Sequence, residues 1–126
     1  MKRHAFLQMI FPPALYAEAD RDRTCAEYAP LFGHDLGEFP TVLMEQMTAM
    51  KACDLTPQLS SLAGIPTLVV GAAHDRIARP VMFRALAAGI PGAELVVFSD
   101  AGHVLPIHDA AAVSDLLERH FCKINS

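Results

Sequence analysis

Residues 65–75 are I-P-T-L-V-V-G-A-A-H-D, and residues 90–103 are I-P-G-A-E-L-V-V-F-S-D-A-G-H. Each stretch begins with an Ile-Pro pair, continues as a short apolar run and ends in small or polar residues. The run over 67–72 is too short for a helix and is apolar throughout, which is typical of a strand buried on both faces of a parallel sheet. The run over 94–98 predicts a second strand of the same kind.

A helix is expected between these two strands, because Pro80 can open one that continues to about Gly89. The order strand, helix, strand makes residues 66–98 a βαβ unit, in which both strands point the same way. Asp109 can cap a final helix. The apolar face of that helix would carry Val113, Leu116, Leu117, His120 and Phe121. The second half of the chain therefore predicts an α/β fold with a βαβα order.

The first half of the chain predicts helices and no strands, with proline and glycine marking the breaks. Helical spacing of apolar residues supports the third of these helices, where Val42, Leu43, Met47 and Met50 recur. The expected elements are a helix over 3–10, a helix over 14–29 that ends near Pro30, a loop over 32–40, a helix over 40–53 and a turn over 56–62.

Length and composition narrow the class of protein. The chain has 126 residues, as expected for one domain, and 52% of them are hydrophobic, which argues against disorder. The net charge of −4, without a basic stripe, argues against a nucleic-acid partner. Three scattered cysteines predict reduced thiols and a cytoplasmic location. Gln8 and Pro12-Pro13 interrupt the apolar N-terminus, so we expect neither a cleaved signal peptide nor a membrane span.

Two side chains with catalytic potential follow the two predicted strands. Asp75 comes three residues after the first strand, and His103 comes five residues after the second. The carboxyl ends of neighbouring parallel strands meet at one sheet edge, about 5 Å apart, so the two side chains can form a hydrogen bond. Such a carboxylate orients an imidazole that acts as a general base. Gly102 is expected to let the backbone turn tightly before the histidine. The alternative is structural, with Asp75 starting a turn and His103 binding a loop carbonyl.

The segments I-P-T-L-V-V-G-A-A-H-D-R-I-A-R-P and I-P-G-A-E-L-V-V-F-S-D-A-G-H resemble the C-terminal part of the α/β-hydrolase fold family. The resemblance is close over residues 55–122 and looser over 1–54, which look like part of the helical cap of such proteins. It predicts two regions, a cap-like segment over 1–54 and a core part over 55–126. By this resemblance, Asp75 is the acid and His103 the general base of a catalytic triad.

The resemblance implies hydrolysis of an ester-like small molecule without a metal or an organic cofactor. In the cap-like segment, Leu43, Met44, Met47 and Met50 could line an apolar acyl pocket. Our predicted substrate-binding residues are Met44, Met47 and Val104. Ordinary core packing is the alternative explanation for the methionine cluster.

The sequence lacks the motif that usually carries the nucleophile of the family. That nucleophile lies in G-x-S-x-G, and no serine of this chain has glycines two residues away on both sides. The sequence Gly33-His34-Asp35-Leu36-Gly37 fits the related G-x-D-x-G pattern. However, Pro30 makes the preceding segment a poor strand, so a cap loop is the favoured interpretation of Asp35. The order nucleophile, acid, base would place the nucleophile upstream of Met1.

Two further functions remain as alternatives. The pairs His74-Asp75 and His108-Asp109, with His103, offer ligands suited to zinc or divalent iron. The chain could also be a non-catalytic module that completes a partner's sheet, because a two-stranded parallel sheet leaves its edges unpaired. We therefore expect a complementing chain or self-association, and no nucleic-acid or membrane partner.

Overall fold

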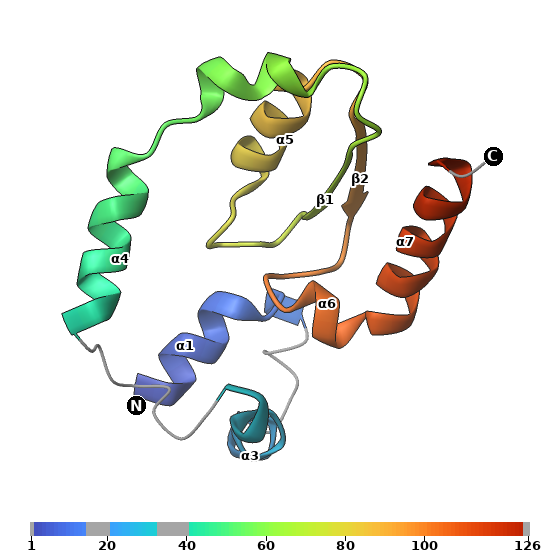
Figure 1. Ribbon diagram of the computed structural model, residues 1–126. Helices are drawn as coiled ribbons and strands as arrows, with labels where there is room; N and C mark the ends of the chain where they lie inside the picture. The colour runs from blue at the N-terminus through green and yellow to red at the C-terminus, as the bar shows by residue number, and fades with distance from the viewer. Residues whose placement is uncertain (1, 15–20, 33–40, 125–126) are drawn as a thin grey trace.

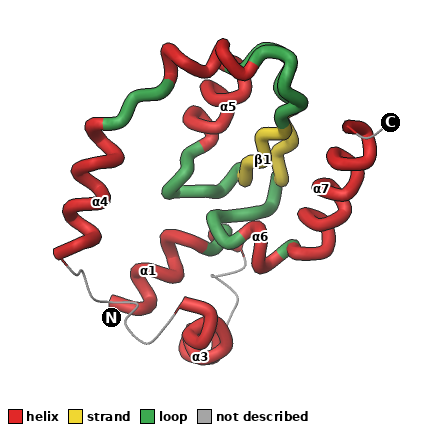
Figure 2. Tube along the Cα trace, in the orientation of Figure 1, coloured by secondary structure: helices red, strands yellow, loops and turns green. Residues whose placement is uncertain are grey.

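The computed structural model describes residues 2–14, 21–32 and 41–124, with helices around a small parallel sheet (Figures 1 and 2). Helices begin and end the described chain, and the sheet with its crossover helix lies between them along the sequence. The elements are α1 (Lys2–Ile10), α3 (Arg21–Phe32), α4 (Thr41–Ala52), the 3₁₀ helix η1 (Thr56–Leu62), β1 (Leu68–Ala72), α5 (Pro80–Gly89), β2 (Glu94–Phe98), α6 (Leu105–His108) and α7 (Ala110–Ile124).

The predicted βαβ unit is confirmed. Strands β1 and β2 are parallel neighbours in register from Leu68 opposite Glu94 to Ala72 opposite Phe98, and α5 connects them. The ladder extends slightly beyond the strands, since the C=O of Thr67 accepts the N–H of Glu94 at 2.9 Å. The α/β class expected from the two apolar runs is therefore the class observed.

The sheet is only partly covered. On β1, Val69 and Ala72 are buried, whereas Leu68 and Val70 are half-buried. No residue of β2 is fully buried, although four of its five residues are apolar. Apolar strand surface that stays half-exposed contributes less to stability than a closed core does. The two-stranded unit thus retains surface that further packing could cover.

Gly71 of β1 is a glycine because α5 packs directly onto it. A Cβ atom built at this position would lie 2.6 Å from the ring of Phe83, which is itself buried. We expect Gly71→Ala to lower the free energy of unfolding by about 1–3 kcal/mol, the usual cost of overpacking. Urea unfolding measures this loss. Gly89→Ala is the comparison, because its Cβ would also come within 2.6 Å of a side-chain atom, but that atom is Cδ1 of Leu59, the end of a side chain that can rotate, and the substitution gains helix propensity. Equal losses in both variants would contradict the prediction.

A second core lies under α1. Leu7, Ile10 and Phe11 are nearly inaccessible to solvent and pack with Val104, which follows β2. The ring of Phe11 also contacts Tyr28 of α3 in an edge-on arrangement with centroids 4.7 Å apart. Partial burial, with a smaller effect of the Glu27 charge, raises the pKa of Tyr28. This cluster joins the N-terminal helices to the loop that follows β2.

Several boundaries differ from the sequence-based expectations. Helix α3 continues through Pro30 to Phe32. A proline two residues from the end removes only one helical hydrogen bond, so it does not stop the helix there. The expected turn over 56–62 is the 3₁₀ helix η1, before which the carboxylate of Asp54 accepts the N–H of Thr56 at 2.9 Å. Hydrogen bonding to Thr56 lowers the pKa of Asp54.

The start of the last helix lies where the sequence predicts it, but an extra turn precedes it. Helix α7 begins at Ala110, and the C=O of Asp109 accepts the N–H of Val113 at 3.0 Å. The carboxylate of Asp109 contacts Nδ1 of His108 at 3.3 Å. The four-residue helix α6 was not expected from the sequence, because four residues are too few for a recognisable apolar period.

Among the described residues, none of the helices combines the length and the apolar character needed to cross a bilayer.

Candidate active site

Asp75 is fixed by the loop between β1 and α5. Its Oδ1 atom accepts the N–H groups of Ile77 and Ala78, both at 2.8 Å. Its own N–H donates to the C=O of Ala72 at 3.2 Å, which turns the chain at the end of the strand. The side chain of Asp75 is only 9% exposed, so its second oxygen, Oδ2, is held in one direction.

His103 lies in the loop that follows β2, beside the Asp75 loop. The N–H of His74 donates to the C=O of Ala101 at 3.0 Å, and that of Ala73 donates to the C=O of Phe98 at 2.9 Å. Both bonds join the two chain segments, and the His74–Ala101 bond does so one residue before Asp75 and two residues before His103. The parallel register thus continues past the strands and brings the two side chains to the same edge.

The two side chains form a hydrogen-bonded pair, as the sequence predicts. Nδ1 of His103 lies 2.9 Å from Oδ2 of Asp75. An ionised carboxylate only accepts hydrogen bonds, so in a neutral imidazole this contact requires the proton on Nδ1, and Nε2 then carries none. The His103 side chain is 41% exposed, which leaves it accessible. We call this pair the dyad. Its geometry suits a base whose Nε2 accepts a proton.

A hollow of about 230 Å³ adjoins the dyad. Its walls come from β1, α5, α6 and α7, and most of them are apolar. The lining residues are Val70, Gly71, Ala72, Asp75, Ala78, Phe83, Gly102, His103, Leu105, Pro106 and Val113. An apolar concavity with one polar pair at its edge is the usual form of a small-molecule site.

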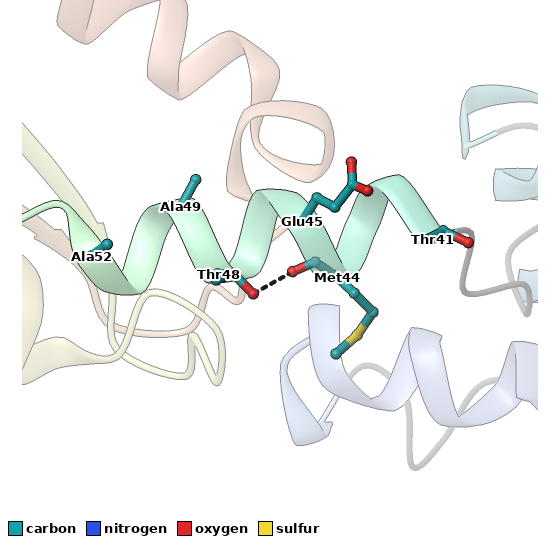
Figure 3. Close-up of a pocket in the computed structure, with 6 residues that line it drawn as sticks. All are labelled: Thr41, Met44, Glu45, Thr48, Ala49 and Ala52. Carbon is teal, nitrogen blue, oxygen red and sulfur yellow. Dashed lines mark hydrogen bonds between the residues drawn. The ribbon is translucent and has the colours of Figure 1, made fainter.

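The predicted substrate-binding methionines lie apart from this hollow. Met44 borders another open hollow, whose six lining residues all belong to α4 (Figure 3). Within it, the hydroxyl of Thr48 donates to the C=O of Met44 at 2.8 Å. Met44 is 56% and Met47 43% exposed, so the described structure does not pack them as core residues. The two hollows share no lining residue, and substrate contact by these methionines stays a prediction.

Val104, the third predicted substrate-binding residue, is 3% exposed and packs against Leu7, Ile10 and Phe11. It does not line the hollow beside the dyad, where its neighbours His103 and Leu105 are found. The sequence places Val104 next to the histidine but does not show which way the side chain points.

The sequence also suggested a metal site and Asp35 as a nucleophile, and the structure bears on the first of these only. Within the described ranges, no three side chains of His, Cys, Asp or Glu are grouped so that they could hold a metal ion. His103 is paired with Asp75 and His108 with Asp109, so the structure does not favour the metal alternative. Asp35 and its flanking glycines lie outside the described residues.

A close backbone contact, and not the expected tight turn, explains why residue 102 is a glycine. The described glycines with positive φ are Gly64 and Gly92, whereas Gly102 lies in close contact with backbone atoms at the end of α1. This contact between distant parts of the chain has no local sequence signal. An apolar helix such as α1 predicts that some surface covers it, but not which surface.

Comparisons with known proteins identify the family of this chain. The pattern of the family described as alpha/beta hydrolase fold matches residues 11–110, which is most of the chain. The chain therefore belongs to the α/β-hydrolase fold family.

Individual relatives carry the names of hydrolases or of degrading enzymes. The chain is 31% identical over 105 residues to "Putative carbamate hydrolase RutD" of Klebsiella pneumoniae subsp. pneumoniae, an alignment that covers 83% of this chain and 38% of the relative. Among solved structures it is similar to Est816, described as an N-acyl homoserine lactone degrading enzyme, with 28% identity and a TM-score of 0.69. That match covers 91% of this chain and 44% of Est816.

An enol-lactonase from Burkholderia xenovorans LB400 is 26% identical with a TM-score of 0.72, and the match covers 95% of this chain and 44% of the lactonase. The chain thus spans less than half the length of each of these relatives. The fold and the family are shared with them over nearly the whole of this chain.

Proposed function

We propose that this chain supplies the acid and the general base of a hydrolase that cleaves a C(=O)–O bond in a small molecule. The observation that carries the proposal is the 2.9 Å contact between Nδ1 of His103 and Oδ2 of Asp75. The names of the two lactone-degrading relatives support this bond type, because hydrolysis of a lactone breaks its C(=O)–O bond.

The chemistry assigned to the dyad is nucleophilic acyl transfer. Nε2 of His103 takes the proton of a nucleophilic hydroxyl, whose oxygen bonds to the carbonyl carbon of the substrate. The proton then passes from Nε2 to the leaving oxygen as the C–O bond breaks. Water repeats both steps and releases the acid. Asp75 keeps Nδ1 protonated and stabilises the imidazolium that forms between the transfers.

The nucleophile is assigned to a segment that pairs with the outer edge of β1. The C=O of Thr67 and the N–H of Ala73 bond to β2, so the backbone groups of every second residue between them, Val69 and Gly71, also face β2. The residues in between face away from β2. The N–H and C=O groups of Leu68 and Val70 therefore point toward this outer edge. No other strand among the described residues pairs there. The hollow beside the dyad is lined by β1 and not by β2, which favours the same edge.

A hybrid protein tests the proposal. In it, this chain replaces the matching part of the Burkholderia xenovorans enol-lactonase, and hydrolysis of the enol-lactone is measured. We expect turnover by the hybrid and a loss of at least about 10³-fold in His103→Ala, because the general base is removed. His108→Ala is the matched control, since His108 pairs with Asp109 on the neighbouring helix end and is outside the dyad.

Equal turnover in the hybrid and its His103→Ala variant would contradict the proposal, as would a folded hybrid without turnover. The isolated chain gives a further test, because we expect it to show no esterase activity. A measurable rate of the isolated chain that disappears in Asp35→Asn would assign the nucleophile to Asp35 instead.

A second candidate function is a non-catalytic module that completes the sheet of a partner. The partly covered strands and the open edge of β1 favour it, because unpaired strand edges pair readily with other strands. The two functions are distinguished by the hybrid. A non-catalytic module would give a folded hybrid that has no turnover dependent on His103.

A further inference from the structure

The C-terminal end of α1 lies against both loops that carry the dyad. The C=O of Ile10 accepts the N–H of Val104 at 3.3 Å, and the C=O of Gln8 accepts Nη1 of Arg76 at 3.4 Å. Val104 and Arg76 each directly follow one member of the dyad. A single helix end therefore holds both loops, one residue away from His103 and Asp75.

Gly102 makes the closest of these contacts. A Cβ atom built on it would lie 2.6 Å from the C=O oxygen of Ile10 and 2.7 Å from the nitrogen of Pro12. Both are backbone atoms, which cannot rotate away as the end of a side chain can. Any side chain at this position must therefore separate the His103 loop from α1.

Buried packing supports the same contact. The side chain of Val104 is enclosed by Leu7, Ile10 and Phe11, so the loop cannot leave α1 without exposing apolar surface. The Arg76 guanidinium lies at the carbonyl end of α1, where a positive charge is favourable.

We propose that the end of α1 is the support that sets the geometry of the dyad. In this proposal, Gly102 is a positioning residue for His103, and Arg76 is a positioning residue for Asp75. A displacement of either loop by about 1 Å would lengthen the 2.9 Å contact beyond hydrogen-bond range. The catalytic meaning rests on the proposed function, but the geometry can be tested without turnover.

The tautomer of His103 reports the geometry. While Oδ2 of Asp75 accepts a hydrogen bond from Nδ1, the neutral imidazole carries its proton on Nδ1. Nitrogen-15 spectra of the ring in the full 126-residue chain distinguish this form from the Nε2–H form. We expect Gly102→Ala to lose the Nδ1–H form as the major species and to lose its hydrogen-bonded proton resonance.

Leu116→Ala is the control for a general loss of stability. Leu116 is buried on α7 and borders Leu68 and Glu94 at the start of the strands, away from the dyad. We expect this variant to be destabilised and to keep the Nδ1–H form. A folded Gly102→Ala chain that also keeps it would overturn the role of Gly102.

Arg76→Gln tests the other loop and remains informative if Gly102→Ala does not fold. We expect a smaller but measurable decrease in the Nδ1–H form, restored by Arg76→Lys, because a charged donor can again reach Gln8. The control is Arg79→Gln, an exposed arginine of the same loop. If Arg76→Gln and Arg79→Gln both match the unmodified chain, the role of Arg76 is overturned. If Gly102→Ala is also unfolded, the whole proposal is then rejected.

This experiment separates the two proposals. A hybrid lactonase without turnover, together with the expected tautomer changes, would reject the function and keep the support. Turnover that depends on His103, together with an unchanged tautomer in Gly102→Ala and Arg76→Gln, would keep the function and reject the support.

Discussion

Asp75→Asn should lower the turnover of the hybrid lactonase by about 10⁴-fold while leaving its fold intact. Oδ1 of Asp75 accepts two N–H groups of its own loop, from Ile77 and Ala78. An asparagine keeps both bonds only if its carbonyl oxygen takes the place of Oδ1. Its NH₂ group then faces Nδ1 of His103 and donates to it, so the imidazole proton moves to Nε2. A protonated Nε2 cannot take the proton of a nucleophile.

The measurements are kcat and KM with the enol-lactone. We expect the loss in kcat, because the substitution removes an interaction of the transition state and leaves the hollow unchanged. Asp109→Asn is the matched control, since it also alters an Asp beside a His, at 3.3 Å, but outside the dyad. A loss of less than about tenfold in Asp75→Asn would mean that the carboxylate does not orient the base.

The dyad was predictable from the sequence because parallel pairing leaves little freedom. Once the runs over 67–72 and 94–98 are neighbouring parallel strands, the residues that follow them share one edge of the sheet. Asp75 and His103 are then close whatever the rest of the chain does. The loops that lead from the strands to these two residues are short, so neither side chain can lie far from the strand end.

The packing of the N-terminal half was not predictable in the same way. Helical spacing identified α4, but the spacing does not show what covers a helix, and Met44 and Met47 are exposed in the structure. Val104 follows the histidine directly, yet it points into the cluster under α1. That contact joins residues about 95 positions apart, so no local pattern predicts it.

The contact between α1 and the loop after β2 also explains the site in energetic terms. The side chain of Asp75 is held by two bonds of its own loop, whereas the backbone before and after His103 also bonds to the neighbouring loop and to α1. A base that is 41% exposed needs such support, because solvent competes for its hydrogen bond. In this proposal, the buried cluster under α1 is a part of the core and also supports the His103 loop.

Phe11→Ala should lower the free energy of unfolding by about 3–5 kcal/mol, the range for removing a buried aromatic ring. Phe11 is 1% exposed, packs with Leu7 and Ile10, and contacts the ring of Tyr28 at a centroid distance of 4.7 Å. Urea unfolding of the full chain, followed by circular dichroism, measures the loss. Leu31→Ala on α3 is the control, because Leu31 is 61% exposed and should change stability by less than about 0.5 kcal/mol.

A second substitution of Phe11 tests whether the core supports the dyad. Phe11→Leu keeps most of the buried apolar area, so it should fold with an intermediate loss of stability. If the α1 cluster supports the His103 loop through Val104, Phe11→Leu should also decrease the Nδ1–H form of His103. Leu116→Ala, which is destabilising elsewhere, should not. A loss in Phe11→Ala as small as that in Leu31→Ala would instead mean that α1 does not pack stably on the loop, and the dyad would then depend on β1 and β2 alone.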